Sequence, residues 1–131
     1  MNTLFIELIQ VAIACRSTLS RIPSAEDWQE LFIQAKRQSL IGVCFYGVAQ
    51  IKHQHQNLPN ELYLKWLALA VKIKQQNEKM NALSIAVYDK LTSDGFDCCI
   101  LKGQAIASFY GLELRELRQS GDIDAFVISE P

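Results

Sequence analysis

The sequence has little proline and glycine, no excess of basic residues and no long apolar run. Three prolines and six glycines in 131 residues exclude a collagen-like or low-complexity chain. Lys and Arg total 13 against 14 Asp and Glu, for a net charge of -1, so no basic surface predicts non-specific nucleic-acid binding. No uninterrupted apolar segment reaches the roughly 20 residues needed to span a bilayer. The composition, half of it apolar, is that of an ordinary globular domain.

The first residues and the cysteines indicate a cellular compartment. Residues 1–14 are mostly apolar, but the segment begins without Lys or Arg, and Glu7 and Gln10 interrupt it, which argues against a secretory signal. Cys15 and Cys44 lie in apolar periodic segments, and the other two cysteines are adjacent to each other. We therefore expect buried, free thiols in a reducing cytoplasm, with no membrane association.

Apolar residues at helical spacing predict a helical subdomain over residues 1–94. Ser24 is the expected N-cap of its second helix, with carboxylates at Glu26 and Asp27 in the first turn. Pro59 suits the first position of the last and longest helix, and Gly95 suits its C-terminal cap. The four predicted helices cover residues 3–19, a segment that begins after Ser24, residues 40–52 and residues 59–93.

The faces of these helices predict a core and a solvated surface. Aromatic residues at helical spacing are expected in the core: Trp28, Phe32, Phe45, Tyr46 and Trp66. Apolar residues trace one face of the longest helix: Leu62, Trp66, Leu69, Ile73, Met80, Leu83, Val87 and Leu91. Lys72, Lys74 and Lys79 lie on the opposite face, which we interpret as solvated, with an acceptor-docking surface as the alternative. His53 and His55 are expected in a polar loop rather than in a zinc site.

The pattern changes after residue 94. A short apolar run over 96–101 and a second over 122–128 predict two strands. Between them we expect a short helix over 104–110 and a charged connection over 112–119. Two strands alone make a marginal sheet. We therefore expect residues 95–131 to be the truncated start of an α/β domain, in a chain that is an N-terminal fragment of a longer protein.

Asp122 and Asp124 form the first of two motifs that carry chemistry. Alternate residues of a strand point to the same side, so the two carboxylates are expected to project together and to repel unless a cation lies between them. Mg²⁺ prefers such oxygen ligands. Ser120 and Gly121 precede the pair and allow a ligand to approach the backbone. The alternative is two solvated acids at the start of a strand.

Lys102 and Gly103 form the second motif, between the first strand and the short helix. Glycine permits a tight turn there, and the amides of a helix start, together with the lysine charge, favour an anion. The alternative is a plain turn. A phosphate-binding turn beside a metal-binding carboxylate pair is the arrangement expected for a nucleoside triphosphate.

The two motifs together carry a resemblance to a known family. Leu-Lys-Gly at 101–103, a short helix ending near Tyr110, and Arg-x-x-Gly-Asp-Ile-Asp-x-x-Val at 118–127 resemble the uncharacterised nucleotidyltransferase family of bacteria. That family lies in the DNA polymerase beta-like nucleotidyltransferase superfamily. The matching positions are Lys102, Gly103, Tyr110, Arg118, Gly121, Asp122, Ile123, Asp124 and Val127.

The resemblance implies Mg²⁺-dependent transfer of a nucleoside monophosphate from a nucleoside triphosphate, with Mn²⁺ as an alternative ion. The acceptor would be a hydroxyl or phosphate on a protein, a small molecule or a nucleic acid. Asp122 and Asp124 would be the catalytic metal ligands, and the nucleotide-binding residues would be Lys102, Gly103, Arg118, Ser120 and Gly121. The implied fold is α+β, a helical bundle followed by the first strands of a nucleotidyltransferase-like mixed sheet.

The sequence departs from the superfamily pattern at two places. At Lys102 and Gly103 the chain has Lys-Gly where the wider superfamily usually has Gly-Ser. The third carboxylate, which the superfamily places on a later strand, has no counterpart in this chain, because no Asp follows Asp124 and Glu130 lies next to the last residue. The alternative function is therefore a non-catalytic interaction or nucleotide-binding module with a degraded nucleotidyltransferase core.

Overall fold

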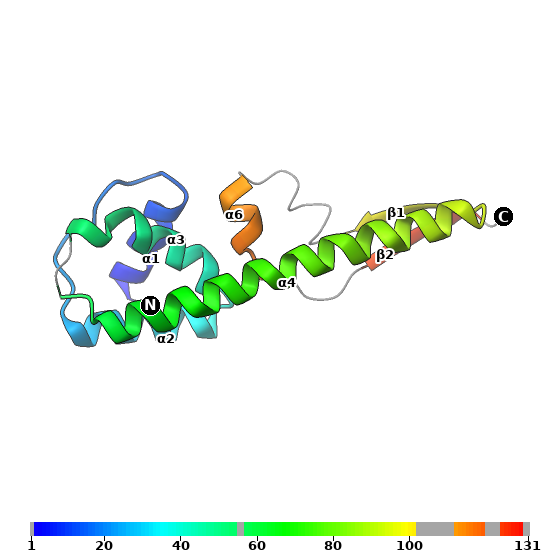
Figure 1. Ribbon diagram of the computed structural model, residues 1–131. Coiled ribbons are helices and arrows are strands. Elements are labelled where there is room, and N and C mark those ends of the chain that lie inside the picture. Colours follow the sequence, from blue (N-terminus) through cyan, green and yellow to red (C-terminus); the bar gives the residue numbers. More distant parts are fainter. Residues whose placement is uncertain (1, 55–56, 102–111, 120–123, 130–131) are drawn as a thin grey trace.

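The computed structural model describes residues 2–54, 57–101, 112–119 and 124–129. Its architecture is α+β, mainly helical, with one two-stranded sheet (Figure 1). Helices α1, α2 and α3 gather at one end, and α4 runs from this bundle to the sheet at the other end. The elements are α1 (Thr3–Ala12), α2 (Ala25–Arg37), α3 (Ile41–Ile51), a short 3₁₀ helix η1 (Lys52–Gln54), α4 (Asn60–Ser93), β1 (Asp97–Leu101), α6 (Leu112–Leu117) and β2 (Asp124–Ser129).

Helix α2 begins where its capping residues predict. The amide of Asp27 donates to Oγ of Ser24 at 3.1 Å, and the amide of Ser24 donates to Oδ2 of Asp27 at 2.9 Å. This reciprocal capping box satisfies two amides that the first turn leaves without helical partners. Arg21 Nη1 also lies 2.7 Å from Oδ2 of Asp27. The expected N-cap at Ser24 is confirmed.

Helix α4 also has the expected ends. Pro59 is its N-cap, so the helix begins at Asn60, one position later than predicted. At the other end Gly95 has φ 90°, and the amide of Phe96 donates to the carbonyl of Leu91 at 3.0 Å. This is the Schellman arrangement, in which a glycine without Cβ adopts the left-handed conformation and turns the chain. The chain therefore reverses at Gly95 and leads into β1.

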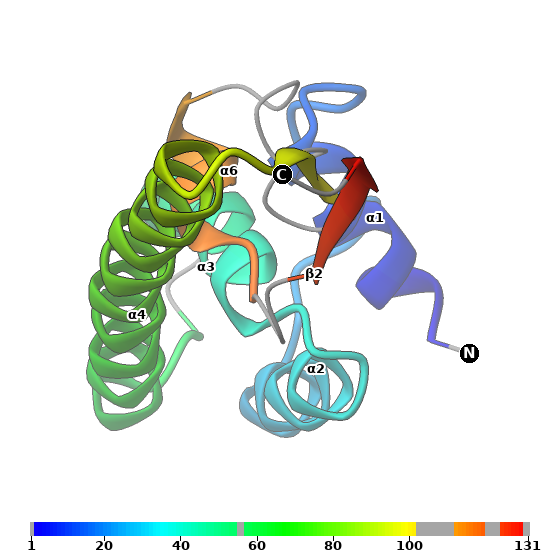
Figure 2. The same ribbon diagram turned by 90° about the vertical axis from the view of Figure 1, so that its right-hand side faces the viewer.

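The core lies where α3 meets its neighbours. Figure 2 shows α3 surrounded by α1, α2, α4 and α6, which accounts for its apolar residues on several sides. Trp28 and Trp66 are fully buried, and the rings of Phe32 and Trp66 meet edge to face with centroids 5.4 Å apart. The core aromatics predicted at Trp28, Phe32, Phe45 and Trp66 are confirmed, and Tyr46 is half-buried.

Helix α1 is shorter than predicted. It ends at Ala12 rather than near Leu19, and Ala14 takes a left-handed φ of 63°. The amide of Cys15 donates back to the carbonyl of Gln10 at 2.8 Å, so the apolar stripe stops although the sequence pattern continues. Cys15 is exposed, and its expected burial is wrong, whereas Cys44 is buried as predicted.

Glu7 holds the segment that follows α1. Its Oε2 accepts hydrogen bonds from the amide and the hydroxyl of Ser20, at 3.1 and 3.0 Å, and Arg16 Nη1 lies 3.4 Å from its Oε1. The hydrogen bond from the Ser20 hydroxyl lowers the pKa of Glu7, although burial acts in the opposite direction. The buried Glu7 carboxylate thus holds the chain between Arg16 and Ser20, most of which the sequence pattern predicts to be helical.

The segment over 112–119 is partly helical. Its charges suggested a connection, but residues 112–117 form α6. Leu117 packs against the hydrophobic core and Leu114 is half-buried. Packing of these leucines against the bundle stabilises a helix that is too short to be stable by itself.

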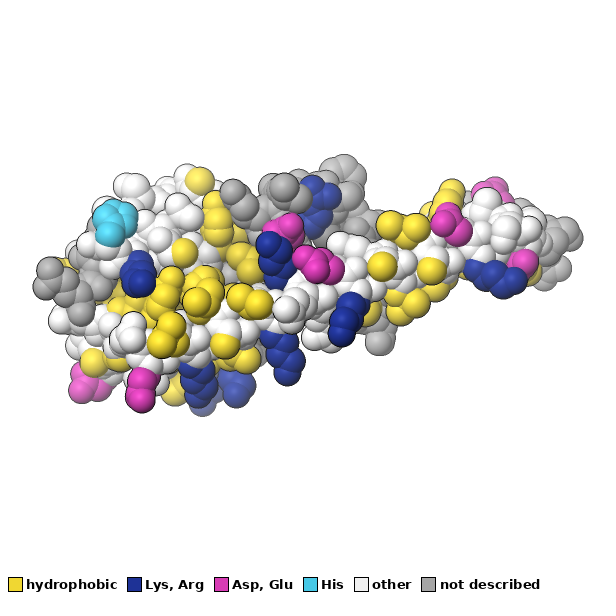
Figure 3. Space-filling view, viewed as in Figure 1, with side chains coloured by type: hydrophobic (Ala, Val, Ile, Leu, Met, Phe, Trp, Pro, Cys, Tyr) yellow, Lys and Arg dark blue, Asp and Glu magenta, His cyan; other side chains and the backbone are white. Residues whose placement is uncertain are grey.

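Strands β1 and β2 pair antiparallel beside the second half of α4 (Figure 1). Leu101 pairs with Asp124 and Ile100 with Ala125. The far half of α4 is less covered than predicted, because Leu83, expected on the apolar face, is 51% exposed. Figure 3 shows hydrophobic side chains at the surface over this half of α4 and the sheet.

Among the residues that the structure describes, no helix has both the length and the apolar composition required to cross a membrane.

Candidate functional site

The candidate site lies where β1 ends and β2 begins. The antiparallel register pairs Leu101, the last residue of β1, with Asp124, the first residue of β2. Lys102 follows Leu101 directly in the chain, and Asp122 precedes Asp124 by two residues. The sheet therefore brings together the two strand ends from which the two sequence motifs continue.

Two of the predicted site residues lie in the described part of the chain. Asp124 begins β2, and Arg118 follows α6 and is half-buried. The others lie outside the described residues, as does the predicted helix over 104–110. They are Lys102, Gly103, Ser120, Gly121 and Asp122.

The backbone of Arg118 is bound by a side chain from α4. Nδ2 of Asn77 lies 2.5 Å from the carbonyl oxygen of Arg118 and 2.6 Å from that of Glu116. Asn77 is 5% exposed. A buried amide is stable only when its polar atoms are hydrogen-bonded, so these contacts fix the position of the end of α6 relative to α4.

Helix α3 binds the same segment from a second direction. The amide of Ile41 donates to Oε1 of Gln119 at 3.1 Å. Ile41 begins α3, where the first amides have no partner within the helix. Next to it, Gly42 leaves room for the backbone of Leu117: a Cβ at Gly42 would lie 2.1 Å from that carbonyl oxygen. The close approach of α6 to α3 therefore requires glycine at position 42.

An ion pair between α4 and α6 adds little to the attachment of residues 116–119. Nζ of Lys74 lies 3.3 Å from Oε2 of Glu116, and the two side chains are 47% and 38% exposed. Pairs with this exposure contribute roughly 0–1 kcal/mol. The buried contacts of Asn77 and Gly42 are therefore the main attachment of residues 116–119. Lys74, expected on a solvated face, contacts the segment that leads to Asp124.

Sequence reasoning missed Asn77. Its position carried a signal, because Asn77 lies four residues after Ile73 and three before Met80, within the apolar stripe of α4. A polar residue in such a stripe is expected to bind a specific partner. Gln119 and Gly42 gave no comparable signal, since their roles depend on contacts between segments distant in sequence.

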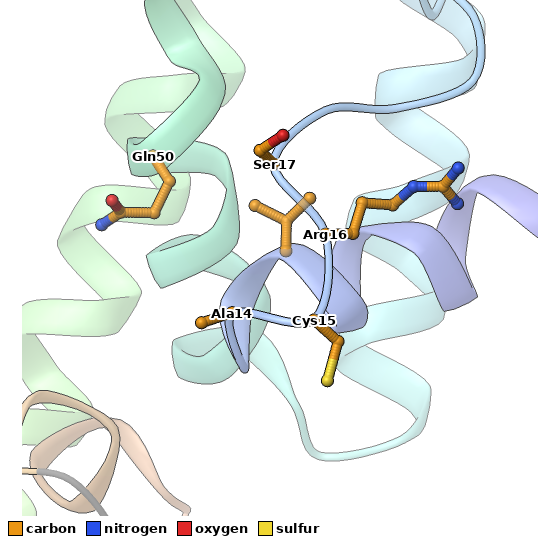
Figure 4. Close-up of a pocket in the computed structure, with 6 residues that line it drawn as sticks. Ala14, Cys15, Arg16, Ser17 and Gln50 are labelled. Carbon is orange, nitrogen blue, oxygen red and sulfur yellow. The ribbon is translucent and has the colours of Figure 1, made fainter.

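A hollow lies at the bundle end, between α3 and the segment that follows α1 (Figure 4). It has a volume of about 630 Å³ and is lined by Val11, Ala14, Cys15, Arg16, Ser17 and Gln50. Arg16, however, directs its guanidinium to Glu7 and Gln10, and Figure 4 shows its side chain leading away from Ser17 and Gln50. Among the described residues that line this hollow, no acidic side chain lies beside a basic one.

The other residues considered from the sequence form no site in the described part of the chain. No three His, Cys, Asp or Glu side chains gather there around a common point. His53 is exposed, and His55 lies outside the described residues. Burial raises the pKa of the Cys44 thiol to about 12, which keeps it protonated and unreactive at neutral pH.

Comparison with known proteins identifies the family. The model of a family described as uncharacterised nucleotidyltransferases matches residues 24–130, a range that includes α2, α3, α4, both strands and both sequence motifs. No curated protein and no solved structure matches the chain. Since the family model covers most of the sequence, this chain belongs to the family of uncharacterised nucleotidyltransferases.

Proposed function

We propose that this chain carries the metal- and nucleotide-binding part of a Mg²⁺-dependent nucleotidyltransferase. The reaction moves a nucleoside monophosphate from a nucleoside triphosphate to an acceptor hydroxyl or phosphate. Membership of the family supports the reaction class. The residues that carry it are those of the two motifs at 101–103 and 118–127, in the nucleotidyltransferase-like arrangement of a DNA polymerase beta-like sheet.

The pairing of Leu101 with Asp124 is the observation that carries the proposal. An antiparallel ladder in this register sets the end of β1 beside the start of β2, so the lysine-glycine motif and the carboxylate motif continue from neighbouring strand ends. In another register, or with the strands parallel, the two motifs would be separated along the sheet. A triphosphate with a bound metal needs both motifs at one place.

The donor set fits a hard divalent cation. Asp122 and Asp124 supply carboxylate oxygens, which Mg²⁺ and Mn²⁺ prefer. The cross-strand partner of Asp124 is Leu101, so the described ladder places no basic residue opposite this carboxylate to neutralise it. When bound, the metal would orient the triphosphate and lower the pKa of the attacking hydroxyl.

The remaining motif residues act on the phosphates. Lys102 supplies a positive charge, and Gly103 lets the triphosphate approach the backbone amides. Arg118 neutralises charge that develops on the phosphates during transfer. Ser120 and Gly121 allow the nucleotide to approach the chain just before the carboxylates.

Thermal unfolding of the 131-residue chain with ATP, GTP, CTP or UTP, with and without Mg²⁺, tests the proposal. A nucleotide at about 100 times its Kd raises the free energy of unfolding by about 2.7 kcal/mol. We expect a Mg²⁺-dependent rise that the double variant Asp122→Asn, Asp124→Asn loses. Asp97→Asn is the matched control, because Asp97 is an exposed carboxylate at the opposite end of β1. A rise that survives in the double variant would overturn the assignment of the metal ligands.

A further inference from the structure

Asn77 stands apart from the other buried residues of α4. The helix buries Leu62, Trp66 and Ala70 against the bundle, but further along the same face it buries an amide. That amide donates to two carbonyl oxygens of one short segment, those of Glu116 and Arg118. The side chain therefore binds a backbone segment and does not fill the hydrophobic core.

The bound segment is held from two helices at once. Asn77 holds it from α4. From α3, the amide of Ile41 donates to the side chain of Gln119, and Gly42, which has no side chain, leaves room for the backbone of Leu117. The contacts fall on four consecutive residues, 116–119, whose chain positions are thereby fixed against both helices. Two converging helices make a rigid support, which is the kind of support that a precise site requires.

This support lies at the start of the motif over 118–127, a few residues before its two carboxylates. Only five residues separate Arg118 from Asp124, where β2 begins, and α4 also packs along β1. One helix thus contacts both the strand that leads to the lysine-glycine motif and the segment that leads to the carboxylates. A shift of residues 116–119 on α4 would therefore displace the segment that leads to Asp124 relative to β1.

We infer that Asn77 is a positioning residue for the metal site: its amide holds residues 116–119 so that Asp122 and Asp124 meet the metal-bound triphosphate. The inference rests on the proposed function. Mg²⁺ demands near-ideal octahedral geometry, and residues that orient metal ligands without touching the metal typically change its affinity 10–100-fold when substituted. Asn77 acts on the carboxylates through the backbone between Arg118 and Asp124.

Titration of Mn²⁺ in the presence of ATP, followed by the electron paramagnetic resonance signal of free and bound Mn²⁺, tests the inference. Asn77→Asp keeps the shape but turns oxygen atoms toward the two carbonyls, and Asn77→Leu removes both donors. We expect each variant to bind Mn²⁺ at least tenfold more weakly than the wild type. Gln119→Ala removes the bond from Ile41 at an exposed side chain, so this milder variant keeps the experiment informative if the Asn77 variants unfold.

Two controls separate positioning from a general loss of stability. Ser84→Ala alters the same face of α4 seven residues further on, where the buried hydroxyl has no hydrogen-bond partner among the described residues. Gly47→Ala places a Cβ 2.7 Å from the carbonyl oxygen of Leu8, so it strains the bundle away from residues 116–119. We expect both to bind Mn²⁺ as the wild type does, although Gly47→Ala unfolds at a lower temperature.

The outcomes distinguish this inference from the function on which it rests. Wild-type affinity in Asn77→Asp and Gln119→Ala would overturn the positioning role and leave the proposed function standing. The same holds if Gly47→Ala weakens Mn²⁺ binding as much as the Asn77 variants do. If the wild type binds no Mn²⁺ through Asp122 and Asp124, the proposed function fails, and the positioning role fails with it.

Discussion

Trp66 donates its indole N–H to the carbonyl oxygen of Ile41 at 2.9 Å, in the buried core between α4 and α3. The amide of the same Ile41 donates to Gln119. The carbonyl and the amide of Ile41, at the start of α3, therefore connect the core of the bundle to the segment that leads to Asp122 and Asp124. The stability of the core and the geometry of the candidate site are linked through this residue.

Trp66→Ala is expected to lower the free energy of unfolding by about 3–5 kcal/mol, as is usual for a buried tryptophan. The variant leaves a cavity against Phe32 and removes the donor to the Ile41 carbonyl. Urea denaturation monitored by circular dichroism measures the change. Trp66→Phe keeps a ring against Phe32 and loses the hydrogen bond, so a smaller loss is expected. An unfolding midpoint for Trp66→Ala equal to that of the wild type would remove this residue from the core.

Gly42→Ala is expected to displace α6. The new Cβ would lie 2.1 Å from the carbonyl oxygen of Leu117, and overpacking of this kind typically costs about 1–3 kcal/mol. Hydrogen exchange measures the local effect, because amides of residues 112–119 should lose protection. Gly47→Ala creates a similar clash with Leu8 but should leave α6 protected. Unchanged protection of residues 112–119 in Gly42→Ala would contradict the close contact between α3 and α6.

Asp27→Asn is expected to change how stability depends on acid pH. The hydrogen bond from Arg21, followed by that from the Ser24 amide, lowers the pKa of Asp27 from 3.8 to about 2. Because the folded state holds the proton less tightly than the unfolded state, the carboxylate stabilises the fold above about pH 4. That contribution is lost as the pH falls toward about 2. Denaturation at a series of pH values should therefore show the wild type and Asp27→Asn converging as the pH drops, and a constant difference would exclude this linkage.

Cys15 and Cys44 are expected to react very differently with iodoacetamide. Cys15 is exposed, whereas Cys44 is buried and its pKa is raised to about 12. The thiolate is the reactive form, so the native protein should be alkylated at Cys15 long before Cys44. Peptide mass spectrometry after timed labelling measures both sites, with urea-unfolded protein as the reference in which both react. Equal native rates would contradict the burial of Cys44.

The parts of the fold that could be predicted are those with local chemical markers. Ser24 with Asp27, Pro59 and Gly95 mark helix ends through contacts a few residues away, so the positions of α2 and α4 follow from the sequence. The end of α1 could not be predicted, because Ala14 carries no turn preference. It adopts a left-handed conformation in a loop that Glu7 holds from the preceding helix.

The same distinction between local markers and distant contacts applies to the candidate site. Its motif residues are evident from the sequence, since the two acids of the carboxylate motif and the glycine of the lysine-glycine motif are unusual next to apolar strands. Its supports are not evident, because Asn77 and Arg118 are 41 positions apart and Ile41 and Gln119 are 78 apart. The helical state of residues 112–117 depends on the same distant contacts, and a local charge pattern could not predict it.

The number of residues in α4 between Trp66 and Asn77 determines how far the Asn77 amide lies from the bundle and in which direction it points. The two residues are eleven positions apart, about three helical turns, so one face of the helix meets the bundle and then residues 116–119. Inserting a single residue between them would turn Asn77 by about 100° around the helix axis and carry its amide away from the two carbonyls. Inserting a seven-residue repeat would nearly restore the angle but move the amide about 10 Å along the axis. Both the number of residues in this stretch and its rotational phase are therefore constrained, even at positions whose side chains contact nothing.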